Sequence, residues 1–320
     1  MKKTYKIIAI LLLTIMLTGC TRYVKVDKKT ITIKKTGQNL TDNILCKPED
    51  KDTLELYDKY SKKLSFKMNE LPDCNKFKAN SKGYTGIWES IFIKPLAFII
   101  LKIGYLLNFK GSFGISIMLL GLVIRLLLFP FSISTAKQQK NMKLAQPKLK
   151  KIEAKYANKT DQESMMMKSQ ETMAVYKELK INPMASCLVA FIQLPIFLAF
   201  LEAIYRIPVV FEDSILGLNL GMTPLKGVTA AHNYFYIVIF VLVLVSTFFS
   251  FRNAMKETST QMPAQEGMPN PQQQTKMMTY MMIVMIGVAS INLSTAILLY
   301  WIVTNTFAIF QNLILKKIVK

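Results

Sequence analysis

Apolar residues gather in long runs along the chain, separated by polar stretches that are rich in lysine. The first run, Gly111–Ser134, is long enough to cross a bilayer, since a spanning helix needs about 20 apolar residues. Later runs cover Met184–Tyr205, Tyr234–Phe251, Met277–Ile291 and Ala296–Leu315. The pattern predicts an all-α membrane protein with five transmembrane helices, the fourth of which would be only about 22 Å long.

The polar stretches predict the orientation of these helices. Thr135–Pro183 has a large excess of lysine in a short loop, which places it in the cytoplasm by the positive-inside rule. Arg206–Asn233 has balanced charge and is predicted to be an outer loop, whereas Arg252–Lys276 is predicted to be a flexible cytoplasmic loop. With five crossings, the tail Lys316–Lys320 lies in the cytoplasm and the N-terminus lies outside.

The stretch Thr135–Pro183 is itself predicted to be a helical hairpin. Apolar residues recur at helical spacing, as at Met142, Ile152 and Tyr156 and then at Met166 and Met173. The polar sequence Asn158-Lys159-Thr160 interrupts this pattern. We predict that Thr160 and Glu163 form a capping box at the start of the second helix.

The N-terminus has the pattern of an export signal. Lysines at 2, 3 and 6 precede the apolar stretch Ile7–Met16, and Leu17-Thr18-Gly19-Cys20 is similar to a lipobox. We predict that residues 1–19 are a lipoprotein signal peptide and that Cys20 carries the lipid. An uncleaved anchor or a chance cysteine is the alternative.

Residues 20–87 would then form a polar extracytoplasmic segment. Cys46 and Cys74 could form a disulfide, because exported thiols meet oxidising conditions, but two unpaired thiols remain an alternative. Residues 88–110 are apolar but interrupted by Lys94, Pro95 and Lys102, a pattern typical of an amphipathic helix lying in the outer interface. A sixth span is the alternative.

Composition narrows the classes of function. The chain is 51% hydrophobic and carries a formal net charge of +21, but the lysines are spread over several segments and no RNA-binding motif accompanies them. A membrane-surface or ribosome-facing role therefore fits better than nucleic-acid binding. The single histidine and four scattered cysteines predict no metal cluster, and the absence of a phosphate-binding glycine loop predicts no nucleotide cofactor.

Arg125 is the charge within the first apolar run. It would lie near 20 Å from either flanking lysine, too far for its guanidinium to reach the headgroups. A central arginine costs about 2.5–3.5 kcal/mol on insertion scales, so a chain that keeps it is expected to use the charge inside a helix bundle. A salt bridge with Glu202 is disfavoured, because the two positions differ by roughly 13 Å in depth.

Several motifs then follow Arg125 in a fixed order: QPKLKKIEAKY, SQETMAVYKELKINPMASC, FIQLPIFLAF and LLYWIVTNTFAIFQNLIL. Over residues 88–315 the chain resembles the YidC-type membrane protein insertases, in particular their Gram-positive lipoprotein (SpoIIIJ-like) branch. It departs from their pattern where Ala185-Ser186 replaces the usual glycine pair, where Asn292–Thr295 replaces the usual Pro-Ala-Gly turn, and in its short C-terminal tail.

The resemblance implies a five-helix core that encloses a hydrophilic groove, open to the cytoplasm and to the lipid. Arg125 would be its positive centre, lined by Gln193 and Trp301, with Tyr300 and Asn305 as weaker candidates. It implies an insertase and chaperone rather than an enzyme, acting alone or beside the Sec translocon in the bacterial cell membrane. The expected clients are small membrane proteins with short translocated tails, and a ribosome or a targeting receptor would dock on the basic hairpin.

Other interpretations of the predicted groove residues stay open. Gln193 could form an ordinary interhelical hydrogen bond, and Tyr300 and Trp301 could belong to an interfacial aromatic belt. An anion transporter using Arg125 would predict internal repeats or paired broken helices, which the sequence does not show. An intramembrane enzyme would need an acid–base pair or metal ligands at membrane depth.

Overall fold

The structure is a computed structural model that describes residues 21–81, 86–157, 159, 161–182, 185–258 and 271–319, without the side chains of 185–192, 253–258, 271–276 and 278–279. The predicted signal peptide, the predicted lipid-attachment residue Cys20 and the predicted cap Thr160 lie outside the described residues.

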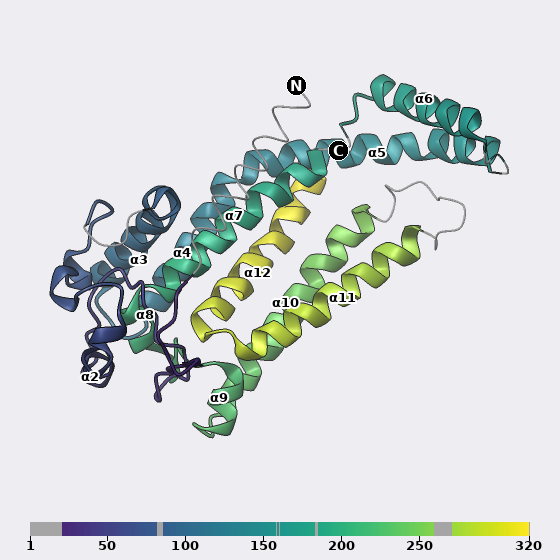
Figure 1. Ribbon diagram of the computed structural model, residues 1–320. Coiled ribbons are helices and arrows are strands. Elements are labelled where there is room, and N and C mark those ends of the chain that lie inside the picture. The colour runs from purple at the N-terminus through teal and green to yellow at the C-terminus, as the bar shows by residue number, and fades with distance from the viewer. Residues whose placement is uncertain are drawn as a thin grey trace. The chain divides into compact units, whose positions relative to one another are not determined.

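The described chain is mainly helical (Figure 1) and divides into two compact units. The first unit comprises Met1–Val123, Gln193–Val243 and Ala289–Val303. The second comprises Ile124–Ile192, Leu244–Val288 and Thr304–Lys320.

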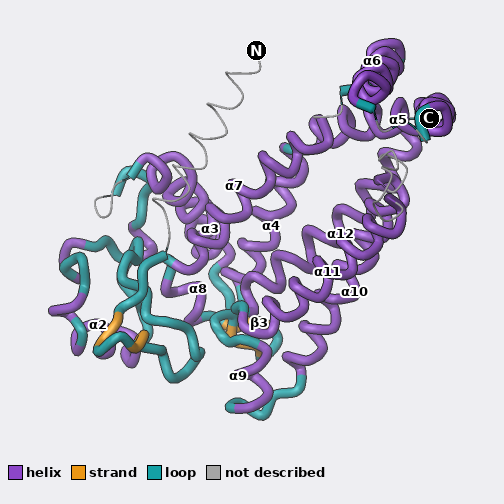
Figure 2. The backbone as a smooth tube through the Cα atoms, turned by 45° about the vertical axis from the view of Figure 1, so that its right-hand side comes forward, coloured by secondary structure: helices purple, strands orange, loops and turns teal. Residues whose placement is uncertain are grey.

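The first unit begins with a small domain, Thr21–Ser81, which we call the N-terminal domain. Its short elements are joined by long loops (Figure 2): β1 (Lys25–Val26), antiparallel to β2 (Lys29–Thr30), then α2 (Lys51–Lys59), η1 (Ser61–Lys63), η2 (Met68–Glu70) and η3 (Cys74–Lys76). Its core consists of Val24, Leu40, Ile44, Tyr57 and Leu71. Cys46 and Cys74 are joined by a disulfide, so the structure has the first of the two alternatives, a bonded pair and not two free thiols.

The next helical stretch is continuous from Glu89 to Leu107. It consists of η4 (Glu89–Ile93), a π-helical turn, and α3 (Lys94–Leu107), with Pro95 in the first turn of α3, where proline is tolerated. The stretch is long and apolar enough to cross a membrane. The predicted interfacial position of this helix remains a prediction.

The first predicted span is broken in the structure. Where the sequence predicts one helix over Gly111–Ser134, there are two, α4 (Ser112–Leu127) and α5 (Phe129–Lys155), bent by 50°. Pro130 in the first turn of α5 explains the break, because its ring clashes with the preceding turn and its nitrogen cannot donate to the carbonyl of Leu126.

The remaining long helices follow the predicted order with different ends. They are α6 (Gln162–Glu178), α7 (Ala185–Tyr205), α10 (Phe235–Thr258), α11 (Pro271–Asn292) and α12 (Thr295–Ile318). The helix α11 is longer than the predicted fourth span, since it begins at Pro271 and its 22 residues reach about 33 Å, but its apolar part, Tyr280–Asn292, is short. The predicted short fourth span remains a prediction. The cytoplasmic loop predicted over Arg252–Lys276 is shortened at both ends, with residues 259–270 outside the description.

Short elements connect α7 to α10 within the first unit. These are α8 (Pro208–Glu212), the antiparallel pair β3 (Ser214–Ile215) and β4 (Leu218–Asn219), and α9 (Pro224–Thr229). Leu218, Tyr236, Ile239 and Leu298 form a buried cluster beside them.

The hairpin of α5 and α6 lies in the second unit, where the two helices run side by side (Figure 1). Its core is formed by Met142, Ala145, Leu149, Val175 and Ile181. Met166 and Met173, which share the predicted helical periodicity, are 58% and 50% exposed and lie outside this core. The second helix is capped by Asp161, which accepts a hydrogen bond from the backbone N–H of Ser164.

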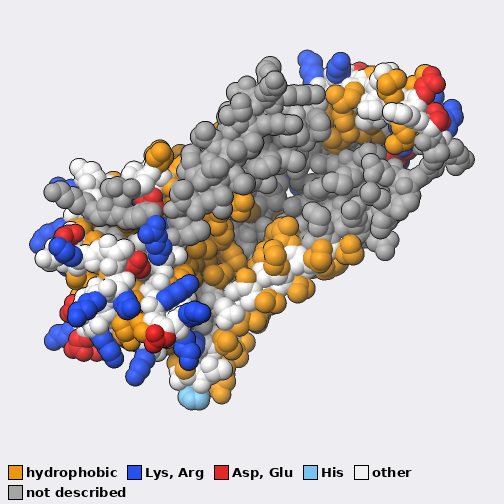
Figure 3. All heavy atoms as spheres, in the orientation of Figure 1, with side chains coloured by type: hydrophobic (Ala, Val, Ile, Leu, Met, Phe, Trp, Pro, Cys, Tyr) orange, Lys and Arg blue, Asp and Glu red, His pale blue; other side chains and the backbone are white. Residues whose placement is uncertain are grey.

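By length and composition, Glu89–Leu107, Phe235–Arg252 and Thr295–Ile318 can each cross a membrane, and the bent pair of α4 and α5 adds a fourth candidate. Apolar side chains stand exposed along α10 and α11 (Figure 3), as lipid contact requires. The protein is therefore an all-α membrane protein. A core of five spanning helices remains a prediction.

Candidate functional site

Arg125 lies near the end of α4, in the second unit, and its side chain is half-buried. The helix ends at Leu127, and the neighbouring side chains Leu126 and Leu127 are 56% and 70% exposed. A cation thus sits within an apolar helix immediately before its break. The break was missed by the sequence analysis, although Pro130 stood in the same apolar run.

Asn305, also in the second unit, contacts the neighbouring helix α10. Its side-chain amide donates a hydrogen bond of 2.9 Å to Oγ1 of Thr247, which is 1% exposed. Thr304 and Gln311 of α12 are also almost fully buried. Asn305 therefore has the interhelical role that polar residues often have within membranes.

Gln193, Tyr300 and Trp301 lie in the first unit. The ring of Phe197 stacks on Tyr300 at 6.2 Å and on Trp301 at 5.9 Å, and Phe200 lies 4.4 Å from Tyr300. Gln193 and Trp301 are half-buried, whereas Tyr300 is only 3% exposed. The ring of Tyr300 therefore packs in the protein interior and does not offer a surface to a groove.

The five predicted site residues are thus divided between the two units: Arg125 and Asn305 lie in the second unit, and the other three lie in the first. A single groove lined by Arg125, Gln193 and Trp301 stays a prediction.

The structure also contains a buried ionic cluster that the sequence did not predict. The guanidinium of Arg206 lies 2.7 Å from a carboxylate oxygen of Glu202 and 3.3 Å from one of Glu89. All three side chains are at most 10% exposed. The cluster joins the end of α7 to η4, and nearby Lys94 donates a hydrogen bond to the carbonyl of Ser81.

Comparison with known proteins identifies the family of the chain. The family model described as 60Kd inner membrane protein matches residues 105–320. A Membrane protein insertase YidC of Oceanobacillus iheyensis is 33% identical over 236 residues, covering 72% of this chain and 84% of the relative. One of Alkalihalophilus pseudofirmus is 35% identical over 228 residues, covering 71% and 81%. The Membrane protein insertase MisCA of Bacillus subtilis is 32% identical over 229 residues, covering 72% and 79%.

The chain belongs to the YidC-type family of membrane protein insertases. The resemblance stated from the motifs is thereby confirmed. The insertase is a multi-pass protein of the bacterial cell membrane and not an enzyme. The family model begins at residue 105, so the N-terminal domain of this insertase lies outside the match.

One part of the ionic cluster had a sequence signal. Glu202, on α7, and Arg206, directly after its last residue, are four residues apart, the spacing that brings opposite charges together on a helix. Glu89 lies 117 residues away from Arg206, and no local pattern connects them. Within the described residues, no three His, Cys, Asp or Glu side chains form a group that could hold a metal ion.

Proposed function

We propose that this insertase receives short or nascent membrane proteins in a hydrophilic intramembrane groove whose positive centre is Arg125, and releases them sideways into the lipid. Five spanning helices would enclose the groove, with Gln193 and Trp301 among its lining residues. The observation that carries the proposal is the half-buried side chain of Arg125 within an apolar helix. Its half-burial leaves part of the side chain accessible to water or to a client.

The physical reason for such a groove is the cost of moving a polar tail through lipid. The hydrocarbon core is about 30 Å thick, and each unsatisfied backbone group within it costs several kcal/mol. A groove that holds water partway across shortens this path, and a cation within it attracts acidic residues of the tail. Transfer of the apolar segment of the client into lipid then drives release.

The remaining assignments extend this proposal. Cys20 is the lipid attachment site, the N-terminal domain lies outside, and the C-terminus lies in the cytoplasm with the hairpin of α5 and α6. The exposed lysines of the hairpin support docking of a ribosome or a targeting receptor there. Clients are small membrane proteins with short translocated tails, inserted by this protein alone or beside the Sec translocon.

The test compares Arg125→Ala with Arg125→Lys in vesicles that contain the purified insertase. A client with an acidic tail should insert about tenfold more slowly with Arg125→Ala, because the attraction of the cation is lost. Arg125→Lys should retain most of the activity, since it keeps the charge while losing the planar guanidinium.

The matched control is Lys137→Ala, which removes an exposed positive charge from the adjacent helix α5. It should insert the same client at nearly the wild-type rate. Wild-type insertion of the acidic-tailed client by Arg125→Ala would contradict the proposal.

A further inference from the structure

The N-terminal domain forms hydrogen bonds to main-chain carbonyl groups at the end of α7. The hydroxyl of Thr41 donates a hydrogen bond of 3.2 Å to the carbonyl of Tyr205, and the backbone N–H of Leu45 donates one of 2.9 Å to the carbonyl of Arg206. The last carbonyls of a helix have no partner within the helix. Here the N-terminal domain supplies donors to such carbonyls, in the way that a helix cap does.

A second contact joins the domain to α8 and α3. The backbone N–H of Glu49 donates a hydrogen bond of 3.0 Å to the carboxylate of Glu212, at the end of α8. The carboxylate of Glu49 in turn accepts a hydrogen bond from the hydroxyl of Tyr105, on α3. Glu49 therefore connects two helices that are far apart in sequence.

A third contact reaches α9. Gly37 has a φ of 73°, and a Cβ atom added there would lie 2.9 Å from Cγ of Lys226. A glycine allows both this backbone conformation and this close approach.

The disulfide joins the loop that contains Thr41, Leu45 and Glu49 to the rest of the domain. Cys46 lies directly after Leu45, and its partner Cys74 begins η3, which packs against α3. The backbone N–H of Lys47 also donates to the carbonyl of Pro72. The loop that holds α7 and α8 is thus covalently joined to the segment that holds α3.

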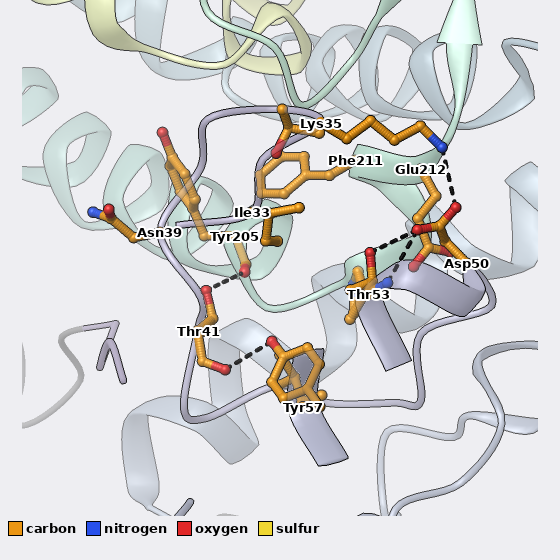
Figure 4. A pocket seen from close by; sticks show the side chains of 13 residues that line it. Ile33, Lys35, Asn39, Thr41, Asp50, Thr53, Tyr57, Tyr205, Phe211 and Glu212 are labelled. Atoms are coloured by element: carbon orange, nitrogen blue, oxygen red, sulfur yellow. Dashed lines mark hydrogen bonds and ion pairs between the residues drawn. The ribbon is translucent and has the colours of Figure 1, made fainter. Parts of the chain in front are cut away.

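The surfaces fit closely around Thr41, whereas beside Glu49, Tyr105 and Glu212 they line an open hollow of about 520 Å³. A cavity of about 20 Å³ lies at the part of the contact around Thr41. Figure 4 shows residues that line it, among them Thr41 and Tyr57 of the domain and Tyr205, Phe211 and Glu212 outside the domain. Such a volume holds about one water molecule. The contact around Thr41 is therefore a packed interface within the chain.

We propose that the N-terminal domain is a brace: it holds the ends of α3, α7, α8 and α9 in one arrangement on the side of the membrane to which it is exported, so that this side stays closed while a client is inserted. The role belongs to residues 21–81, which the family model does not match. It goes beyond the groove and its cation.

The test removes the side-chain contacts of the brace and leaves the core of the domain and its disulfide intact. The interface variant combines Thr41→Val, Tyr105→Phe and Glu212→Ala in the full-length protein. In intact cells, trypsin added outside should cleave after Arg206, whose side chain is 0% exposed and whose carbonyl accepts the hydrogen bond from Leu45, about tenfold faster than in the wild type. In vesicles, insertion should fall about fivefold for acidic-tailed and neutral-tailed clients alike, whereas loss of Arg125 would act mainly on the acidic-tailed client.

The matched control places the same kinds of substitution in the same domain, away from the interface: Thr32→Val, Tyr60→Phe and Glu70→Ala. It should resemble the wild type in both measurements. Migration on gels with and without reductant reports whether the disulfide of the interface variant has formed. If the combined variant does not fold, Thr41→Val alone is used, because it keeps the shape of the side chain.

Two kinds of result would overturn the proposal. Unchanged cleavage after Arg206 in a folded interface variant would show that these contacts do not hold the domain in place. Faster cleavage with wild-type insertion would show that docking does not serve insertion.

Discussion

Arg206 and Glu202 form a salt bridge of 2.7 Å at the end of α7, and the arginine side chain is completely buried. Glu89 of η4 lies 3.3 Å from the same guanidinium. Buried charges cost several kcal/mol each in desolvation, which only well-formed contacts offset. The cluster therefore fixes the start of the Glu89–Leu107 helical stretch against the end of α7.

Arg206→Met should destabilise the protein strongly, by about 3–5 kcal/mol, because two buried carboxylates lose their counter-charge. The measurement is thermal unfolding of the purified protein in detergent. Adding Glu89→Gln and Glu202→Gln to Arg206→Met should recover much of the loss, since no charge would then be left unpaired. Unfolding of Arg206→Met at the wild-type temperature would contradict this role.

Glu212 gives the contact between the N-terminal domain and α8 a dependence on pH. Burial raises the pKa of its carboxyl to about 7, the N–H groups of Glu49 and Asp50 oppose the shift, and the charges of Asp50 and Glu49 add to it. The folded state thus binds a proton more tightly than the unfolded state, so the free energy of unfolding falls as pH rises from about 4.5 to about 7.

In Glu212→Gln, this part of the pH dependence should disappear. The glutamine oxygen can still accept the hydrogen bond from Glu49, but the side chain does not ionise. Melting temperatures at pH 5 and pH 8 should differ less than in the wild type. The control Glu70→Gln changes an exposed carboxyl and should leave the wild-type difference intact. An unaltered difference in Glu212→Gln would contradict the assignment.

The hydrogen bond between Asn305 and Thr247 can be measured by a double-mutant cycle. Hydrogen bonds between membrane helices contribute about 0.6 kcal/mol on average and about 1.7 at most. We expect a coupling energy in this range from the unfolding of Asn305→Ala, Thr247→Ala and the double variant in detergent. Additive effects of the two substitutions would show that the bond adds nothing to stability.

The sequence predicted the fold class and the order of the long helices, because apolar runs and helical periodicity are local signals. It failed at two helix boundaries. Pro130 divides the first apolar run into α4 and α5, and the polar residues before Met277 hid the first part of α11. Both signals are visible in the sequence but are weaker than the apolar run beside them.

Contacts between distant parts of the chain could not be predicted. Pairing of Cys46 with Cys74 requires a Cα–Cα distance that only the fold supplies, here 4.8 Å. Glu89 meets Arg206 for the same kind of reason. Among the candidate site residues, Tyr300 was assigned by its motif, yet its burial depends on Phe197 and Phe200 of another helix.

The hydrogen bond from Thr41 to Tyr205 spans 164 residues of sequence. At ribosomal speeds of 5–20 residues per second, the later partner is made on the order of ten seconds after the earlier one. During that interval the N-terminal domain has no α7 to bind, and its contacts are those of its own core and disulfide. The biogenesis of this insertase thus includes an interval in which the N-terminal domain lacks the interface with α7, and the interval ends only when the C-terminal end of α7 has been synthesised.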